Sequence, residues 1–179
     1  MRILIITSSP HKKGASSSSL LAGHFAEGAE AAGHSVETFD AGHANLHPCL
    51  GCDHCGMAGP CVHEDDMTAA RAAILACDLP AFVTPLYYFG MSAQLKTLID
   101  RFYAFNGELS AKRLKTVLIA AAWDSNDWTM RDLAAHYQTL CRYLHFQDMG
   151  MILGTGCGSP AMTAASGFPA KAFALGKSL

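Results

Sequence analysis

Four cysteines crowd into one short stretch of the chain, with the spacing C-x2-C-x2-C-x5-C. They are Cys49, Cys52, Cys55 and Cys61. Gaps of two residues let successive thiolates converge on one metal centre, and the glycines between them relieve crowding of the backbone. The pattern leaves three alternatives: an iron–sulfur cluster, thiols without metal in a loop that covers a ligand or a partner, and structural zinc.

A serine-rich loop follows the first apolar run of the chain and leads directly into a helix pattern. Its hydroxyls, together with backbone N–H groups at a helix N-terminus, suit a phosphate dianion. His11, Lys12 and Lys13 add positive charge, and the first acidic residue is Glu27. Neither the Walker spacing nor G-x-G-x-x-G is present, which disfavours ATP and a dinucleotide bound in Rossmann fashion. The alternative is a flexible loop in which a single serine caps the helix.

An aromatic stretch, "TPLYYFGMSAQLKTLIDRF", spans residues 84–102. We expect Pro85 to end a strand, Gly90 to let the backbone pass close to a ligand, and Ser92 to begin a helix. A flat heterocycle would lie against the aromatic rings, with backbone N–H groups near Gly90 and Met91 at its polar edge. Alternatively, the rings cover the sheet edge or form a dimer contact.

Composition excludes several classes of protein. The chain has 179 residues, half of them hydrophobic and 16% charged, which excludes a disordered chain. A net charge of −2 gives no electrostatic reason to expect nucleic acid, and no segment has the length of a membrane span. The first apolar run is too short for a signal peptide, and the seven cysteines are odd in number. We therefore expect a cytoplasmic protein with free or metal-bound thiols.

Apolar runs alternate with helical patterns along the whole chain, which predicts a three-layer α/β/α sandwich formed by residues 1–179 as a single domain. Predicted strands cover residues 2–7, 34–40, 79–84, 115–122 and 149–155, the second with the polar alternation of an edge strand. Predicted helices cover residues 19–32, 67–77, 92–105, 129–145 and 168–177. Five parallel strands favour the flavodoxin-like order 2-1-3-4-5. Ligands of such a sheet bind at the carboxyl ends of its strands, in the loops 7–18, 41–66, 85–91, 123–128 and 154–165.

The motifs "SSP…SSS" and "PLYYFGMSAQLKTLIDR" resemble the NAD(P)H-dependent FMN reductases, flavodoxin-like oxidoreductases that include iron–sulfur flavoproteins. The resemblance runs over nearly the whole chain, although His11 replaces the arginine usual in the first loop. It implies FMN at the strand 1/strand 3 switch point, with Trp123 or a neighbour closing the far side, unless Trp123 is a buried structural residue. The cofactor-binding residues that it implies are Ser9, Pro10, Ser16, Ser17, Ser18, Pro85, Leu86, Tyr87, Tyr88, Phe89, Gly90, Met91, Ala122 and Trp123.

The activity implied by the resemblance is transfer of a hydride from NAD(P)H to FMN and then to a small oxidant such as a quinone, an azo or nitro compound, or flavin. No residue of the chain is assigned a catalytic acid–base role. The four cysteines match the [4Fe–4S] motif of the iron–sulfur flavoproteins. Dimerisation, as a homodimer or a dimer of dimers, is also implied. Two alternatives from other classes are an iron–sulfur flavoprotein that carries electrons between protein partners, and a zinc-binding or redox-sensing module without flavin.

Overall fold

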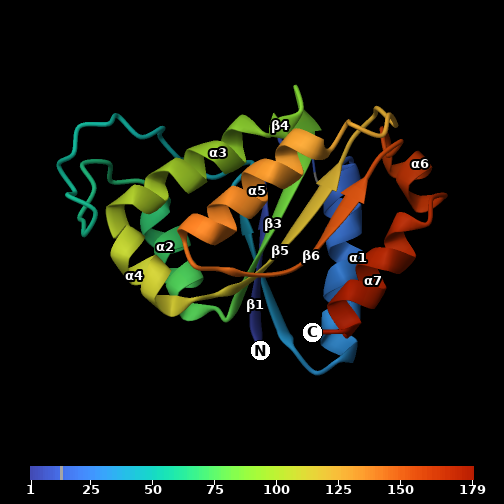
Figure 1. Ribbon diagram of the computed structural model, residues 1–179, viewed down its shortest axis with the longest axis horizontal. Helices are drawn as coiled ribbons and strands as arrows, with labels where there is room; N and C mark the ends of the chain where they lie inside the picture. Colours follow the sequence, from blue (N-terminus) through green and yellow to red (C-terminus); the bar gives the residue numbers. More distant parts are fainter. Residues whose placement is uncertain (13) are drawn as a thin grey trace.

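A parallel sheet forms the centre of the molecule, and helices cover both of its faces (Figure 1). The computed structural model describes residues 1–12 and 14–179, so Lys13, one of the charges expected beside the serine loop, lies outside the described residues. Five strands are parallel and follow the order β2-β1-β3-β5-β6, which confirms the flavodoxin-like arrangement. A short sixth strand, β4, pairs with β3 in antiparallel fashion. The strands are β1 (Arg2–Thr7), β2 (Ser35–Asp40), β3 (Leu79–Tyr87), β4 (Gly90–Met91), β5 (Lys115–Ala121) and β6 (Gln147–Gly154).

The helices form one layer on each face of the sheet, and successive side chains of a central strand pack against alternate layers. From β1, Ile3 and Ile5 pack towards α1 and α7, whereas Leu4 and Ile6 pack towards α2, α3 and α5. The helical segments are α1 (Ser17–Ala31), α2 (Met67–Ala76), α3 (Ala93–Asp100), the 3₁₀ segment η1 (Arg101–Phe105), α4 (Asn106–Lys112), α5 (Arg131–Tyr143), α6 (Pro160–Ala164) and α7 (Phe168–Lys177). Among the described residues, no helix combines the length and apolar character that crossing a membrane would require.

Helices α1 and α7 touch backbone to backbone because each supplies a glycine at the crossing. A Cβ on Gly28 would lie 2.1 Å from the carbonyl oxygen of Phe173, and one on Gly176 would lie 2.1 Å from that of Phe25. Any larger residue would force the helices apart. This close packing fixes the C-terminal half of α1 against α7.

Two expectations about the elements were wrong. Pro85 does not end β3: the strand continues to Tyr87, because Pro85 pairs with Ala121 of β5 and the next two residues pair with β4. The predicted helix 92–105 divides into α3 and η1, and α4 and α6 were not predicted. Short helices such as these carry too few residues to show a clear period in the sequence.

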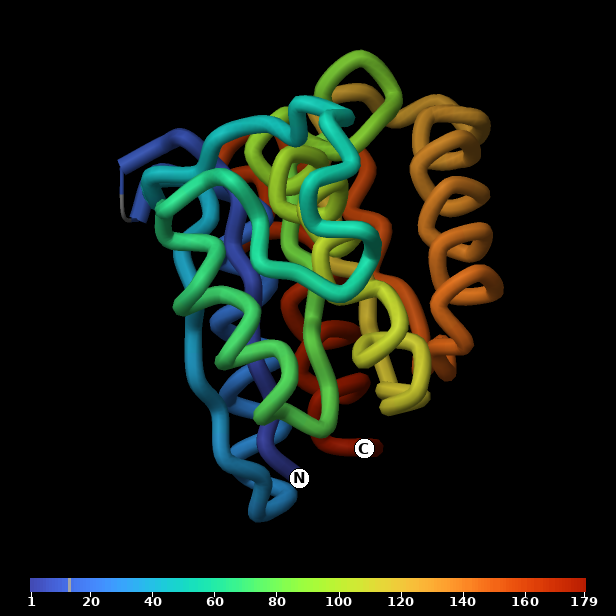
Figure 2. The backbone as a smooth tube through the Cα atoms, turned by 90° about the vertical axis from the view of Figure 1, so that its left-hand side faces the viewer, coloured from blue at the N-terminus to red at the C-terminus, as the bar shows by residue number. Residues whose placement is uncertain are grey.

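The segment 41–66, which holds the four cysteines, has no helix or strand of its own. Figures 1 and 2 show it in teal, running along the outside of α2 and α3. The chain termini lie near each other, away from this segment (Figure 2). The loop is thus an addition to the sandwich, attached to one of its helical layers.

Candidate functional site

A cavity of about 320 Å³ opens where β1, β3 and β5 end. The chain leaves β1 towards β2 on one side and returns to β3 on the other, so this is the switch point at which doubly wound sheets bind ligands. Eight of the predicted cofactor-binding residues line the cavity: Ser9, Ser16, Ser17, Ser18, Pro85, Leu86, Tyr87 and Trp123. Loops distant in sequence therefore meet here as expected.

One end of the cavity is a cradle of hydroxyls at the start of α1. Ser16 is the N-cap, and its Oγ accepts a hydrogen bond from the N–H of Ser19 at 3.2 Å. The hydroxyls of Ser16 and Ser18 lie 3.1 Å apart, and the first turn of α1 contains no acidic residue. The positive end of the helix dipole therefore faces the cavity without a competing carboxylate. This is the chemistry that a phosphate group requires.

A buried hydrogen-bond network joins this cradle to the aromatic stretch. The Oγ of Ser92, the N-cap of α3, donates to the carbonyl oxygen of Ser8 at 3.1 Å and lies 2.9 Å from its hydroxyl. In turn, the Ser8 hydroxyl donates to the carbonyl of Val83, and the Ser92 N–H donates to Oγ1 of Thr84. All three hydroxyl residues are fully buried. Satisfied buried networks of this kind fix their partners in place, so the two ligand loops form one rigid unit.

The aromatic stretch forms a hairpin with a two-residue turn. Leu86 pairs with Met91 and Tyr87 with Gly90, and the turn residues Tyr88 and Phe89 have φ values of 45° and 63°. Positive φ at both turn positions defines a turn that normally carries Asn and Gly, so two aromatic residues there store strain. Such strain is typical of functional segments.

The tip of the hairpin does not line the cavity. Tyr88 is fully exposed, and the ring of Phe89 lies 5.0 Å from that of Trp128, in the loop after β5. The contact braces the hairpin against that loop. Six predicted cofactor-binding residues are therefore near the cavity in sequence but do not line it: Pro10, Tyr88, Phe89, Gly90, Met91 and Ala122.

Trp123 forms the opposite wall and rests on the backbone of Gly158. A Cβ at Gly158 would lie 2.2 Å from the indole ring, so only glycine permits this contact. The Trp123 side chain is 73% exposed, which excludes the alternative of a buried structural tryptophan. The sequence analysis did not assign several other residues that line the cavity. Three of them carried a signal in the sequence: His11 is a basic residue of the serine-rich loop, and Cys157 and Gly158 lie in the glycine-rich segment 154–160. The missed residues are His11, Ala15, Ala121, Cys157 and Gly158.

The four cysteines line a second cavity, of about 470 Å³, between their loop and the α3–η1 junction. Cys49 and Cys52 are exposed, whereas Cys55 and Cys61 are half-buried. Within the described part of the chain, no three cysteine sulfurs lie within 4.8 Å of one another. A single zinc ion, about 2.3 Å from each sulfur, would need that closeness, so zinc would require the loop to rearrange. A [4Fe–4S] cluster would take the four thiolates as its ligands.

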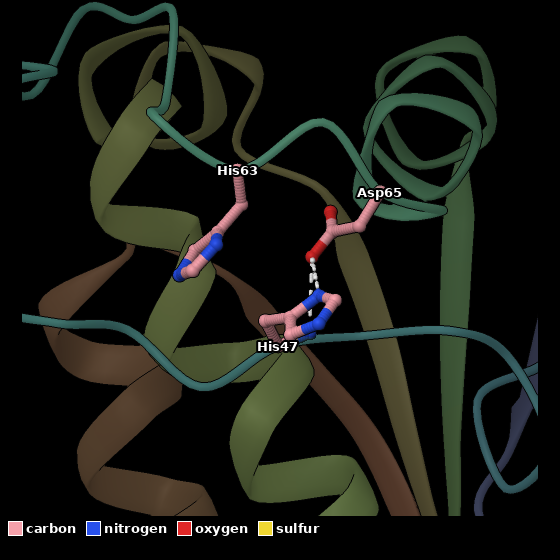
Figure 3. Close-up of side chains that lie close together, drawn as sticks. All are labelled: His47, His63 and Asp65. Carbon is pink, nitrogen blue, oxygen red and sulfur yellow. Dashed lines mark hydrogen bonds and ion pairs between the residues drawn. The ribbon is translucent and has the colours of Figure 1, made fainter.

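His47, His63 and Asp65 do bring three ligand atoms within 4.8 Å (Figure 3). The imidazole rings are stacked, with centroids 5.2 Å apart. The Asp65 carboxylate, however, is already saturated. Its Oδ2 accepts from Arg101 Nη1 at 2.7 Å and from the His47 N–H, and its Oδ1 accepts from Arg101 Nη2 and the Met67 N–H. These three side chains are therefore an anchor for the loop rather than a vacant metal site.

This anchor is a buried ion pair at the base of the cysteine loop. The side chains of Arg101 and Asp65 are 1% and 0% exposed, and Arg101 also donates to the carbonyl of His47 at 2.8 Å. Burial alone raises the pKa of Asp65, but Arg101 and the backbone N–H groups outweigh it and hold that pKa well below its usual range. Both ends of the loop, at His47 and Asp65, are thus fixed to η1.

The Nε–H of Arg101 is buried and has no hydrogen-bond partner among the described residues. Burial lowers the pKa of Arg101, but Asp65 and then Cys61 more than compensate and raise it. Arg101 and Cys61 both line a third cavity, of about 1100 Å³, beneath the loop.

Comparisons with known proteins agree with this geometry. The sequence model of a family described as NADPH-dependent FMN reductase matches residues 1–155. An iron–sulfur flavoprotein of Archaeoglobus fulgidus is 34% identical over 101 residues, which cover 56% of this chain and 45% of that protein. This chain spans about half the length of the curated iron–sulfur flavoproteins that it matches.

Solved structures share the fold. A NAD(P)H:quinone oxidoreductase from Methanothermobacter marburgensis superposes with a TM-score of 0.75 at 20% identity, covering 99% of this chain and 94% of that one. An FMN-dependent NADH-azoreductase from Bacillus anthracis, solved with FMN, gives 0.70 at 14% identity, covering 99% and 98%. At these identities the likeness establishes the flavodoxin-like fold alone.

Proposed function

The chain belongs to the NADPH-dependent FMN reductase family, and from this premise we propose that it binds FMN at the switch-point cavity and uses NAD(P)H to reduce a small oxidant. The observation that carries the proposal is the meeting of two kinds of surface in one cavity. Ser9, Ser16 and Ser17 offer hydroxyls beside a helix N-terminus, while Leu86 and Trp123 offer apolar walls. A flavin mononucleotide needs both, a phosphate cradle and a flat apolar slot.

The chain's own residues have defined tasks in this proposal. The hydroxyl cradle holds the phosphate, and the network of Ser8, Thr84 and Ser92 keeps it in register with the hairpin. Tyr87 and Trp123 shield the ring from water on two sides. When bound, FMN supplies the hydride-accepting chemistry.

The oxidant is proposed to be a quinone, an azo or nitro compound, or free flavin, because the cavity is open and its walls are apolar and aromatic. The exposed hairpin, with Tyr88 at its tip, is proposed to contribute to a homodimer or dimer-of-dimers interface that completes the pocket. A cytoplasmic location is also proposed, from the odd number of cysteines in the sequence.

A [4Fe–4S] cluster held by Cys49, Cys52, Cys55 and Cys61 is the proposed role of the cysteine loop. One observation supports the fit: the four thiols line one cavity. The curated relatives named iron–sulfur flavoproteins support it as well. Iron and acid-labile sulfide, measured on protein purified without oxygen, test it. Protein that is free of iron and keeps four reactive thiols would rule the cluster out.

A second candidate function is electron transfer between protein partners. The exposure of Cys49 and Cys52 favours it, since a centre near the surface is accessible to a partner protein. Anaerobic mixing of the FMN-loaded protein with NADH or NADPH separates the two functions. We expect rapid bleaching of the flavin band with at least one nucleotide. Flavin that resists both nucleotides but is reduced by a small iron–sulfur protein would favour the carrier.

A further inference from the structure

The turn that follows β2 packs directly against Ser9, which lines the switch-point cavity. A Cβ on Gly42 would lie 2.3 Å from the carbonyl oxygen of Ser9 and 2.9 Å from its carbonyl carbon. Both are backbone atoms, so rotation of a side chain cannot relieve the contact. The φ of Gly42 lies outside the left-handed region. Close approach of two backbones, rather than the shape of the turn, therefore requires glycine here.

We propose that Gly42 and Asp40 are positioning residues of the flavin site, which set the place of Ser9 and thereby the affinity for the phosphate of FMN. The proposal deepens the function above and rests on FMN binding at the switch-point cavity. It requires a turn that does not yield, and a Ser9 that has a hydrogen bond to offer the ligand.

Asp40 holds the turn at the end of β2. Its Oδ1 accepts the N–H of Gly42 at 3.0 Å and the hydroxyl of Thr7, the last residue of β1, at 3.4 Å. Its Oδ2 lies 2.9 Å from Nδ1 of His43. The Gly42 N–H also reaches the carbonyl of Thr7, at 3.2 Å, and Ala41 is buried in the core. The turn therefore cannot retreat from Ser9 without breaking its contacts with β1.

Ser9 itself is held firmly on one side only. Ser8, which precedes it, belongs to the buried network with Ser92. Pro10 and His11, which follow it, are both exposed. A Cβ pressed against the Ser9 carbonyl should therefore displace Ser9 and the exposed residues after it, while the turn stays in place.

The hydroxyl of Ser9 has a hydrogen to donate to a bound anion. Its Oγ accepts the N–H of His11 at 3.3 Å, and within the described part of the chain it donates to no acceptor. Ser9 is only 4% exposed. A buried donor without an acceptor is unfavourable, and a phosphate oxygen in the cavity would satisfy it with a charge-assisted bond. A shift of Ser9 should thus weaken the binding of FMN more than that of riboflavin, which lacks the phosphate.

The first test titrates flavin-free Gly42→Ala with FMN and with riboflavin. We expect FMN to bind about tenfold more weakly than to the wild type, the worth of one hydrogen bond to a charged group, and riboflavin to bind with unchanged affinity. Gly23→Ala is the matched control, because a Cβ on this exposed residue of α1 meets nothing within 4 Å. It should bind both flavins as the wild type does. Unchanged FMN affinity in Gly42→Ala, or an equal loss for both flavins, would overturn the role of Gly42.

A second pair of variants decides the matter if Gly42→Ala does not fold. Asp40 is exposed, and Asp40→Asn removes its charge but keeps an oxygen that accepts the Gly42 N–H. Asp40→Ala removes both. Because the two variants lose the same charge, the difference between them reports the turn alone. Asp40→Ala should bind FMN about threefold more weakly than Asp40→Asn, the worth of one neutral hydrogen bond, with no difference for riboflavin. Equal FMN affinities in this pair would overturn the proposal.

The wild-type titrations separate this inference from the function on which it rests. A wild type that binds no FMN, or binds it no more tightly than riboflavin, overturns both. A wild type that prefers FMN, together with a Gly42→Ala variant that keeps the full preference, overturns the positioning role and leaves the flavin site intact.

Discussion

The switch-point cavity, which is the proposed flavin cavity, and the cysteine loop lie in one chain but are built in different ways. The cavity is made by the fold itself: strands end there, α1 begins there, and three buried hydroxyls join its two main loops. The cysteine loop has no regular structure and is fixed at its ends by one buried ion pair, Arg101 with Asp65. The first site should therefore withstand single substitutions that the second cannot.

The largest expected effect follows from breaking the ion pair. Asp65→Ala leaves the guanidinium of Arg101 buried without its partner, which typically costs about 3–5 kcal/mol of unfolding free energy. Chemical denaturation measures the loss, and limited proteolysis should show cleavage within residues 48–61 before the rest of the chain. Glu64→Ala, at an exposed neighbour, is the control and should change the free energy of unfolding by less than about 0.5 kcal/mol. Equal losses in the two variants would contradict the anchoring role.

The same pair has a defined pH dependence. Because the pKa of Asp65 is lower in the folded than in the unfolded protein, its stabilisation is complete above the unfolded value of about 3.9 and declines as the pH falls below it. The difference in unfolding free energy between wild type and Asp65→Asn should thus be constant near neutral pH and shrink in acid. A difference that grows towards acid pH would have the wrong sign.

A negative charge in the hydroxyl cradle should weaken FMN binding without destabilising helix α1. Ser17→Asp places a carboxylate in the cavity at the α1 N-terminus, where it favours the helix dipole but repels a phosphate. We expect FMN affinity to fall about a hundredfold with little change for riboflavin, which lacks the phosphate. Ser19→Asp is the matched control, in the same helical turn but outside the cavity lining. Equal losses for FMN and riboflavin would place the phosphate elsewhere.

A smaller effect is expected at the aromatic wall. Gly158→Ala puts a Cβ into the space of the Trp123 ring, and this exposed side chain is free to swing away. FMN affinity should weaken about three- to tenfold, the worth of one aromatic contact, with a change in tryptophan fluorescence. Gly107→Ala, which meets nothing within 4 Å, is the control and should bind FMN normally. Unchanged FMN affinity in Gly158→Ala would exclude Trp123 from the flavin site.

The smallest effect should come from the middle of the cysteine loop. The hydroxyl of Tyr103 donates to Asp53 Oδ1 at 2.7 Å, in an exposed position. Exposed contacts contribute little, so Tyr103→Phe should lower the unfolding free energy by about 0.5 kcal/mol or less and leave iron content unchanged. A loss as large as that of Asp65→Ala would mean that the loop is held along its length rather than at its ends.

The sequence predicted the proposed flavin cavity better than it predicted the support of the cysteine loop. The reason is that the elements around the cavity follow from local sequence patterns. Strand runs and the cap Ser92 are read from short stretches, and a parallel sheet then brings their ends together. The burial of Arg101 cannot be read that way, because it depends on Asp65, 36 residues earlier. The bond between Ser8 and Ser92 spans 84 residues. Pairing across such distances is a property of the folded chain.

Titration of the flavin-free protein with FMN tests the central claim most directly. Quenching of flavin fluorescence should reach an end point at one FMN per chain, with riboflavin binding more weakly by the contribution of the phosphate. Iron content should not alter this result, because the cavity is built independently of the cysteine loop. A protein that leaves FMN fluorescence unchanged at every ratio, or that binds riboflavin as tightly as FMN, would contradict the account.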